Sequence, residues 1–127
     1  MTKKIKILLA DDILIAREGW KYILETDDLV EVVGECDAAY KIFAKIQETN
    51  PDILLMNLKW FGDVSAGTTV REIKKSFTNV RIIAITAYEN LISDARLAGA
   101  DVVLLKTFTR EKLLTIIREL APREINT

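Results

Sequence analysis

Five short apolar runs recur along the chain, and each is followed by a segment with a different spacing of apolar residues. The clearest run covers residues 52–57, where four consecutive apolar residues follow Pro51-Asp52 and end on Asn57. An unbroken apolar run of this length is typical of a strand that is buried on both faces of a sheet. The runs that we interpret as strands are residues 5–10, 30–34, 52–57, 80–85 and 101–105.

The segments between these runs place apolar residues three and four positions apart, which is the spacing of an amphipathic helix. Ile13 is expected on the inward side of the first helix. Asp37 can cap the second helix, Gly99 can end the fourth, and Pro122 ends the last. The expected helices cover residues 13–26, a segment after Asp37 in which residues 39–46 keep helical spacing, about residues 65–77 and 89–98, and a last segment from near Thr109 to Pro122.

Strands that alternate with helices in this way predict an α/β fold, with a doubly wound, five-stranded parallel sheet covered by helices on both faces. Right-handed crossovers leave few topologies, and we expect the strand order 2-1-3-4-5. A chain of 127 residues suits one domain. We place that domain at residues 1–122 and interpret residues 123–127 as a tail or the start of a linker.

Polar residues follow four of the five predicted strands. Asp11 and Asp12 follow the first strand, Asn57 ends the third, Thr86 follows the fourth and Lys106 follows the fifth. In the expected strand order these ends lie side by side, at the edge where such sheets bind ligands. Carboxylate and amide oxygens suit Mg²⁺, whereas a hydroxyl and an ammonium suit phosphate oxygens.

Each of these residues also has an ordinary structural interpretation. Asp12 could cap the first helix, and Asn57 or Thr86 could satisfy a turn. Lys106 alone would most often be a solvated surface lysine. The joint pattern favours a site, because four strands deliver complementary groups to one edge.

Composition excludes several other functions. The chain has no histidine, which rules out phosphohistidine chemistry, His zinc sites and His-dependent triads within it. Its single cysteine, Cys36, cannot form an internal disulfide and is expected to be a small buried residue. The net charge of −1 argues against direct nucleic-acid binding. No apolar run has membrane-spanning length, and Met1-Thr2-Lys3-Lys4 leads straight into a strand, so we expect a cytoplasmic domain without membrane contact.

At this point the chain resembles a known family, the receiver domains of two-component response regulators, which have a flavodoxin-like (CheY-like) fold. The resemblance covers about residues 4–121. The segments that carry it are Ile7-Leu8-Leu9-Ala10-Asp11-Asp12, Pro51-Asp52-Ile53-Leu54-Leu55-Met56-Asn57-Leu58, Ala84-Ile85-Thr86-Ala87 and Leu104-Leu105-Lys106.

The resemblance implies a role for each strand-end residue. In the family, an acid pair and an acceptor aspartate hold Mg²⁺, and a sensor histidine kinase passes its phosphoryl group to that aspartate. The implied metal ligands are Asp11, Asp12, the residue at position 57 and the backbone carbonyl of Lys59. Thr86, Ala87 and Lys106 match the positions around the phosphoryl oxygens. Phosphorylation in the family shifts a face that here would include Leu91, Ile92, Arg110 and Leu113, and a homodimer through this face is a further expectation.

Asn57 breaks the match at the acceptor position. An amide has no anionic oxygen to attack phosphorus, so stable aspartyl phosphate is not available there. Its carbonyl can still coordinate a cation, and we therefore expect weakened Mg²⁺ binding. The family usually has prolines where this chain has Phe61 and Thr107, and an aromatic residue where it has Val103.

We interpret the chain as an atypical receiver that acts by binding a sensor kinase or another signalling protein, and not as an enzyme. The closest alternative is the receiver of a DNA-binding transcriptional regulator, with a C-terminal effector domain and an engineered Asp-to-Asn change. An enzyme or flavin carrier on the same fold is a third alternative. It is disfavoured because Asp11-Asp12 would repel a flavin phosphate and no nucleophile is evident.

Overall fold

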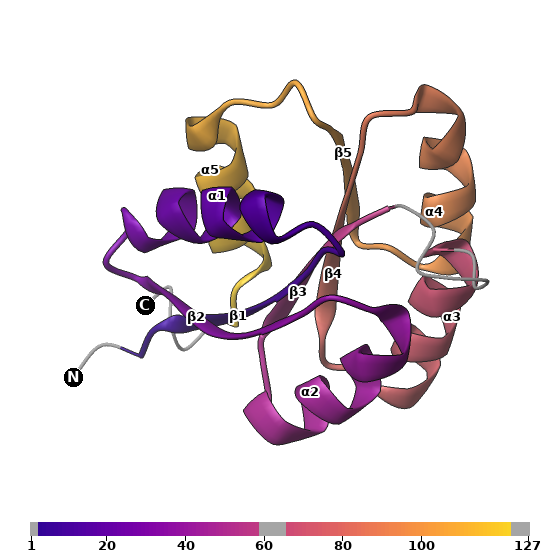
Figure 1. The fold of residues 1–127 in the computed structure, drawn as a ribbon, viewed down its shortest axis with the longest axis horizontal. Coiled ribbons are helices and arrows are strands. Elements are labelled where there is room, and N and C mark those ends of the chain that lie inside the picture. The colour runs from indigo at the N-terminus through magenta and orange to yellow at the C-terminus, as the bar shows by residue number, and fades with distance from the viewer. Residues whose placement is uncertain (1–2, 59–65, 123–127) are drawn as a thin grey trace.

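The computed structural model describes residues 3–58 and 66–122, which form a parallel sheet between two layers of helices (Figure 1). The strands are β1 (Ile5–Ala10), β2 (Val30–Cys36), β3 (Ile53–Asn57), β4 (Arg81–Thr86) and β5 (Val102–Leu105). The helices are α1 (Leu14–Glu25), α2 (Ile42–Thr49), α3 (Ala66–Ser76), α4 (Ile92–Ala98) and α5 (Arg110–Leu120), with 3₁₀ turns η1 (Ala39–Lys41) and η2 (Glu89–Leu91) before α2 and α4.

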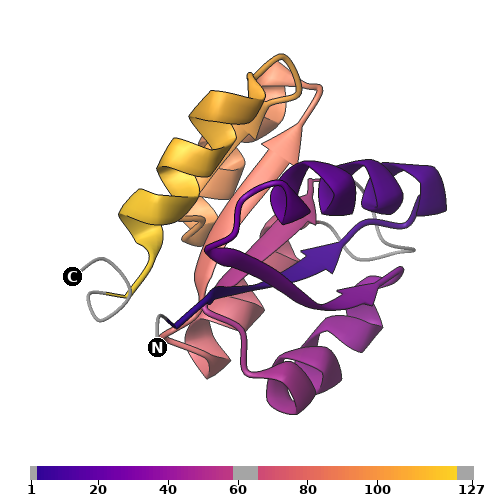
Figure 2. The same cartoon turned by 90° about the vertical axis from the view of Figure 1, so that its left-hand side faces the viewer.

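All strand pairs are parallel, and the order is β2-β1-β3-β4-β5, which confirms the predicted topology. Helices α1 and α5 cover one face of the sheet, whereas α2, α3 and α4 cover the other (Figures 1 and 2). Within the described residues, no helix is both long and apolar enough to cross a membrane.

The central strand β3 explains why its sequence is apolar without interruption. Ile53 and Leu55 belong to the core on the α1–α5 side, whereas Leu54 and Met56 belong to the core on the other side. Every residue of β3 is buried, so each of its positions needs an apolar side chain or a satisfied polar one. Asn57 is the polar exception, and its amide donates a hydrogen bond to the carboxylate of Asp11.

Strand β2 is two residues longer than the sequence predicts, because it runs past Gly34 to Cys36. A bulge shifts its pairing with β1 from Ile7–Val32 to Leu8–Gly34. A Cβ atom at Gly34 would lie 3.1 Å from Cγ2 of Thr49 and 3.3 Å from Cδ1 of Leu8. Glycine therefore lets α2 pack closely on the bulged strand, which carries β2 up to the edge where β1 ends.

Most of the predicted helix ends are confirmed. Gly99 follows α4 with a φ of 112°, and the Thr109 hydroxyl caps α5 by accepting a hydrogen bond from the backbone N–H of Lys112. The prediction for Asp37 is wrong. Ala38 is the N-cap residue of η1, and the Asp37 carboxylate instead accepts a hydrogen bond from Nζ of Lys41 at 2.7 Å. The Asp37 carboxylate therefore binds a lysine four residues along the chain instead of a backbone N–H group at the start of the helix.

Two predicted side-chain positions are also wrong. Ile13 is 38% exposed, because it is the N-cap of α1 with extended backbone and lies outside the helical repeat. Leu113 is fully buried against the sheet, so it cannot form part of an outer face with Leu91 and Ile92. Arg110 is directed toward Thr26 of the α1 end, and both of its side-chain hydrogen bonds go to that hydroxyl.

Candidate functional site

Asp11 and Asn57 meet where two neighbouring strands end. Because Ala10 of β1 pairs with Met56 of β3, the residues that follow them lie side by side. The Asn57 amide donates a hydrogen bond from Nδ2 to Oδ2 of Asp11, at 3.1 Å. Both residues are buried, with 4% of Asn57 and 1% of Asp11 exposed. Hydrogen bonds between a buried amide and a carboxylate are stronger than neutral ones, so this contact fixes the orientation of both side chains.

The second oxygen of Asp11 is also engaged. Oδ1 accepts a hydrogen bond from the backbone N–H of Ile13 at 2.9 Å, which closes a turn between β1 and α1. Asp12 is exposed, and it does not occupy the N-cap position of α1, which belongs to Ile13. The alternative in which Asp12 caps the helix is therefore not supported. Asp12 is left as a solvent-facing carboxylate beside a buried one whose two oxygens each accept a hydrogen bond.

Arg17 lies over the end of β1 and was missed by sequence reasoning. Its Nη1 donates to the backbone carbonyl of Asp11 at 2.7 Å, and its Nε donates to Oε1 of Glu35 at 3.2 Å. The other oxygen of Glu35 accepts from Nζ of Lys21 at 3.3 Å, and this hydrogen bond raises the pKa of Lys21. The only hint in the sequence is a basic residue in the helix after the acid pair and an acidic residue near the end of the neighbouring strand.

Thr86 and Lys106 lie at the ends of β4 and β5. Their backbones are adjacent, since the N–H of Lys106 donates to the carbonyl of Thr86 at 2.9 Å. The Thr86 hydroxyl is fully buried and accepts a hydrogen bond from the N–H of Tyr88 at 3.0 Å, so in this structure it satisfies a turn. Lys106 and Ala87 are exposed. The predicted residues therefore share one edge of the sheet, with direct side-chain contact between Asp11 and Asn57.

This arrangement offers a divalent cation fewer anionic ligands than a third carboxylate at position 57 would supply. Each oxygen of Asp11 already accepts one hydrogen bond from an N–H group, and the Asn57 NH₂ group points at the carboxylate. Among residues 3–58 and 66–122, no group of three acidic, histidine or cysteine side chains is placed to hold a metal. The backbone carbonyl of Lys59, a further predicted ligand, lies outside the described residues.

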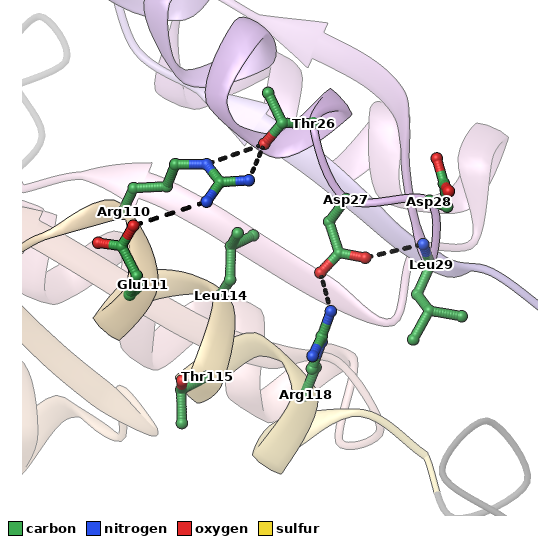
Figure 3. A pocket seen from close by; sticks show the side chains of 9 residues that line it. All are labelled: Thr26, Asp27, Asp28, Leu29, Arg110, Glu111, Leu114, Thr115 and Arg118. Atoms are coloured by element: carbon green, nitrogen blue, oxygen red, sulfur yellow. Dashed lines mark hydrogen bonds and ion pairs between the residues drawn. The ribbon is translucent and has the colours of Figure 1, made fainter.

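A pocket of about 520 Å³ lies away from these strand ends, between the α1–β2 turn and α5 (Figure 3). Asp27 is nearly buried there, and its carboxylate accepts hydrogen bonds from Nη2 of Arg118 at 2.6 Å and from the N–H of Leu29 at 2.9 Å. Arg110 donates two hydrogen bonds to the hydroxyl of Thr26. These contacts attach α5 to the end of α1, and we assign the pocket no part in the strand-end site.

Comparison with known proteins agrees with the fold and with the family resemblance. A family model for the response regulator receiver domain matches residues 7–118. The chain is 31% identical to the transcriptional regulatory protein YxjL of Bacillus subtilis, over 95% of this chain and 56% of that protein. It is also 31% identical to a nitrate/nitrite response regulator homologue of Haemophilus influenzae, over 98% of this chain and 61% of that protein.

A solved structure of a response regulator has the same fold as this chain. The chain superposes on a two-component response regulator of the LuxR family from Aurantimonas with a TM-score of 0.84 and 26% identity, covering 98% of this chain and 96% of that one. The two curated relatives are considerably longer, since the chain spans little more than half the length of each.

Proposed function

This chain belongs to the receiver domains of two-component response regulators, and from that premise we propose that it is an atypical receiver. In this proposal it forms no aspartyl phosphate at position 57 and acts by binding a partner. It performs no catalysis of its own. The partner is a sensor histidine kinase or another signalling protein, and the setting is cytoplasmic.

The hydrogen bond from Asn57 to Asp11 carries this proposal. An acceptor must attack phosphorus with a lone pair on an anionic oxygen. The side chain at the end of β3 instead presents an amide N–H to the neighbouring carboxylate, at 3.1 Å. The amide also brings no negative charge to the site and shares its N–H with a carboxylate that would ligate the cation, which is why we propose weakened Mg²⁺ binding at Asp11, Asp12 and position 57.

A second candidate function is favoured by the relatives themselves. YxjL is named as a transcriptional regulatory protein, and the chain spans 56% of its length. The chain could therefore serve as the receiver part of a DNA-binding regulator, with a C-terminal effector domain that contacts DNA while the receiver does not. A gene that continues past codon 127 into a helix-turn-helix domain would support this candidate. An aspartate codon at position 57 would also support it, because the receiver could then be regulated by phosphorylation.

The proposal predicts that the outer face of α4, β5 and α5 keeps one conformation whatever is added to the strand-end site. Backbone NMR spectra of the native protein should not change there when Mg²⁺ and beryllofluoride, a mimic of the phosphoryl group, are added. The Asn57→Asp variant is the matched control, because it restores the carboxylate to which beryllofluoride binds. Large shifts in the native protein that spread from Thr86 into residues 88–98 would rule out the proposal.

A further inference from the structure

We propose that the fold protects Asn57 from deamidation, a modification that would create the missing phosphoryl acceptor. Deamidation replaces the side-chain amide by a carboxylate, so it would give position 57 the anionic oxygen that phosphoryl transfer needs. This inference rests on the proposed function and deepens it, because it explains why the folded chain keeps the amide. It implies that the side chain at position 57 is fixed once the chain has folded.

Deamidation of an asparagine proceeds through a cyclic intermediate. The backbone nitrogen of the next residue attacks Cγ, a C–N bond forms, and the side-chain amide leaves as ammonia, which takes up the proton that the attacking nitrogen loses. Water then opens the succinimide ring and gives aspartate or isoaspartate, of which only aspartate is a phosphoryl acceptor. At position 57 the attacking atom is the backbone nitrogen of Leu58.

The backbone around Asn57 keeps that nitrogen away from Cγ. Asn57 is the last residue of β3 and pairs with Ile85 of β4. The N–H of Leu58 donates to the carbonyl of Ile85 at 2.6 Å. Ring closure would have to break this hydrogen bond and rotate the chain out of its extended conformation. Leu58 is only 3% exposed, so the same rotation would also disturb a buried side chain.

The side chain of Asn57 is also held in place. Its Nδ2 donates to Oδ2 of Asp11 at 3.1 Å, which orients the amide toward the end of β1. Only 4% of Asn57 is exposed, so water has little access to Cγ or to the leaving nitrogen. A carboxylate formed here without a cation would lie against the carboxylate of Asp11, which disfavours the product as well as the reaction.

Asn90 provides a matched comparison, because it is also followed by a leucine, Leu91. The two Asn-Leu pairs are chemically alike, so their deamidation rates should be similar when the chain is unfolded. Asn90 is exposed and lies in the 3₁₀ turn η2, where the N–H of Leu91 donates to the carbonyl of Tyr88 at 3.1 Å. A short turn opens locally at lower cost than a central strand. A difference between the two sites in the folded protein therefore measures the effect of the strand.

The test follows both sites by peptide mapping with mass spectrometry during incubation in mildly alkaline buffer. One sample is native, and the other is unfolded in guanidinium chloride. In the unfolded sample, Asn57 and Asn90 should deamidate at rates within about threefold of each other. In the native sample, Asn57 should deamidate at least about a hundredfold more slowly than when unfolded, because core strands open rarely, whereas Asn90 should be slowed by a much smaller factor. Circular dichroism confirms that the native sample stays folded throughout.

The ratio of unfolded to native rates decides the matter at each site. The inference is supported if this ratio is larger for Asn57 than for Asn90, and it is overturned if the two ratios are equal or reversed. Acetyl phosphate and Mg²⁺ separate this failure from a failure of the proposed function. Freshly prepared native protein that gains a phosphoryl group contradicts the proposed function. Native protein that gains one only after long incubation, with aspartate at position 57, contradicts only the protection of Asn57.

Discussion

Asn57 and Asp11 show how one side chain changes the physical chemistry at the ends of two neighbouring strands. With an aspartate at position 57, two buried carboxylates would face each other, and a metal would have to offset their repulsion. With the amide, the same two positions attract each other through a 3.1 Å hydrogen bond. The native side chain therefore stabilises the metal-free protein at the position where a carboxylate would destabilise it.

Replacing Asn57 by aspartate should lower the stability of the metal-free domain. We expect a loss of about 1–3 kcal/mol in EDTA, because a buried charge-assisted hydrogen bond becomes a carboxylate–carboxylate contact. Denaturant unfolding monitored by circular dichroism measures the change. Saturating Mg²⁺ should raise the midpoint of the variant more than that of the native protein. Equal or reversed midpoints in EDTA would mean that the site charges are too well solvated to matter.

The expectation that Cys36 is a small buried residue is confirmed. It is 4% exposed, its Sγ donates to the carbonyl of Leu9 at 3.7 Å, and burial raises its pKa from 9.0 to about 11. The thiolate fraction near neutral pH is then about a hundredfold lower than in the unfolded chain. Alkylation by iodoacetamide at fixed pH should be at least that much slower in the folded protein than in urea. Similar rates would show that the thiol is accessible.

The same pKa shift sets a stability change at high pH. The pKa of Cys36 is higher in the folded protein than in the unfolded chain. Its neutral thiol therefore contributes to the free energy of unfolding in full below pH 9.0, and this stabilisation is lost as the pH rises toward about 11. A Cys36→Ala variant lacks this titration, so its stability should decline less over that range. Parallel pH profiles for the two proteins would contradict the assignment.

At the scale of elements, β2 and its bulge explain what the sequence could not reveal about the site. The strand ends Asp11, Asn57, Thr86 and Lys106 were predictable, because parallel strands end at one edge and four of the five apolar runs lead into a polar residue. The contacts of Arg17 and Glu35 were not. They depend on how far β2 extends past Gly34 and on the reach of long side chains from α1, neither of which follows from hydrophobic periodicity.

Glycine substitutions test the packing of β2 directly. Gly34→Ala should destabilise the protein by about 1–3 kcal/mol, because its Cβ would lie 3.1 Å from Cγ2 of Thr49. Gly19→Ala is the matched control in the middle of α1. A Cβ there meets nothing within 4 Å, so we expect a gain of about 0.5–1 kcal/mol from helix propensity. Thermal unfolding gives both values, and a neutral Gly34→Ala would show that α2 can move away from β2 at little cost.

At the scale of the whole molecule, α1 and α5 are joined to each other on one face of the sheet. On one face, stacking of Trp20 on Phe108, with ring centroids 5.4 Å apart, and the Asp27–Arg118 ion pair join α1 to the α5 segment. In the described residues the sheet has the predicted order, and alternation of strands with helices together with right-handed crossovers had narrowed the topologies to a few. The direction of the Arg110 side chain was not predictable, because a residue at the start of α5 can face either the end of α1 or the side of α4.

Phosphoryl transfer tests the central claim most directly. Native protein and the Asn57→Asp variant are each incubated with acetyl phosphate and Mg²⁺, and intact-mass spectra are recorded before and after. The account predicts no change in the native mass, because the amide at position 57 supplies no nucleophile. The variant should gain one phosphoryl group, since Thr86 and Lys106 remain available for its oxygens. A native protein that gains a phosphoryl group would contradict the account, because another residue would then be the acceptor.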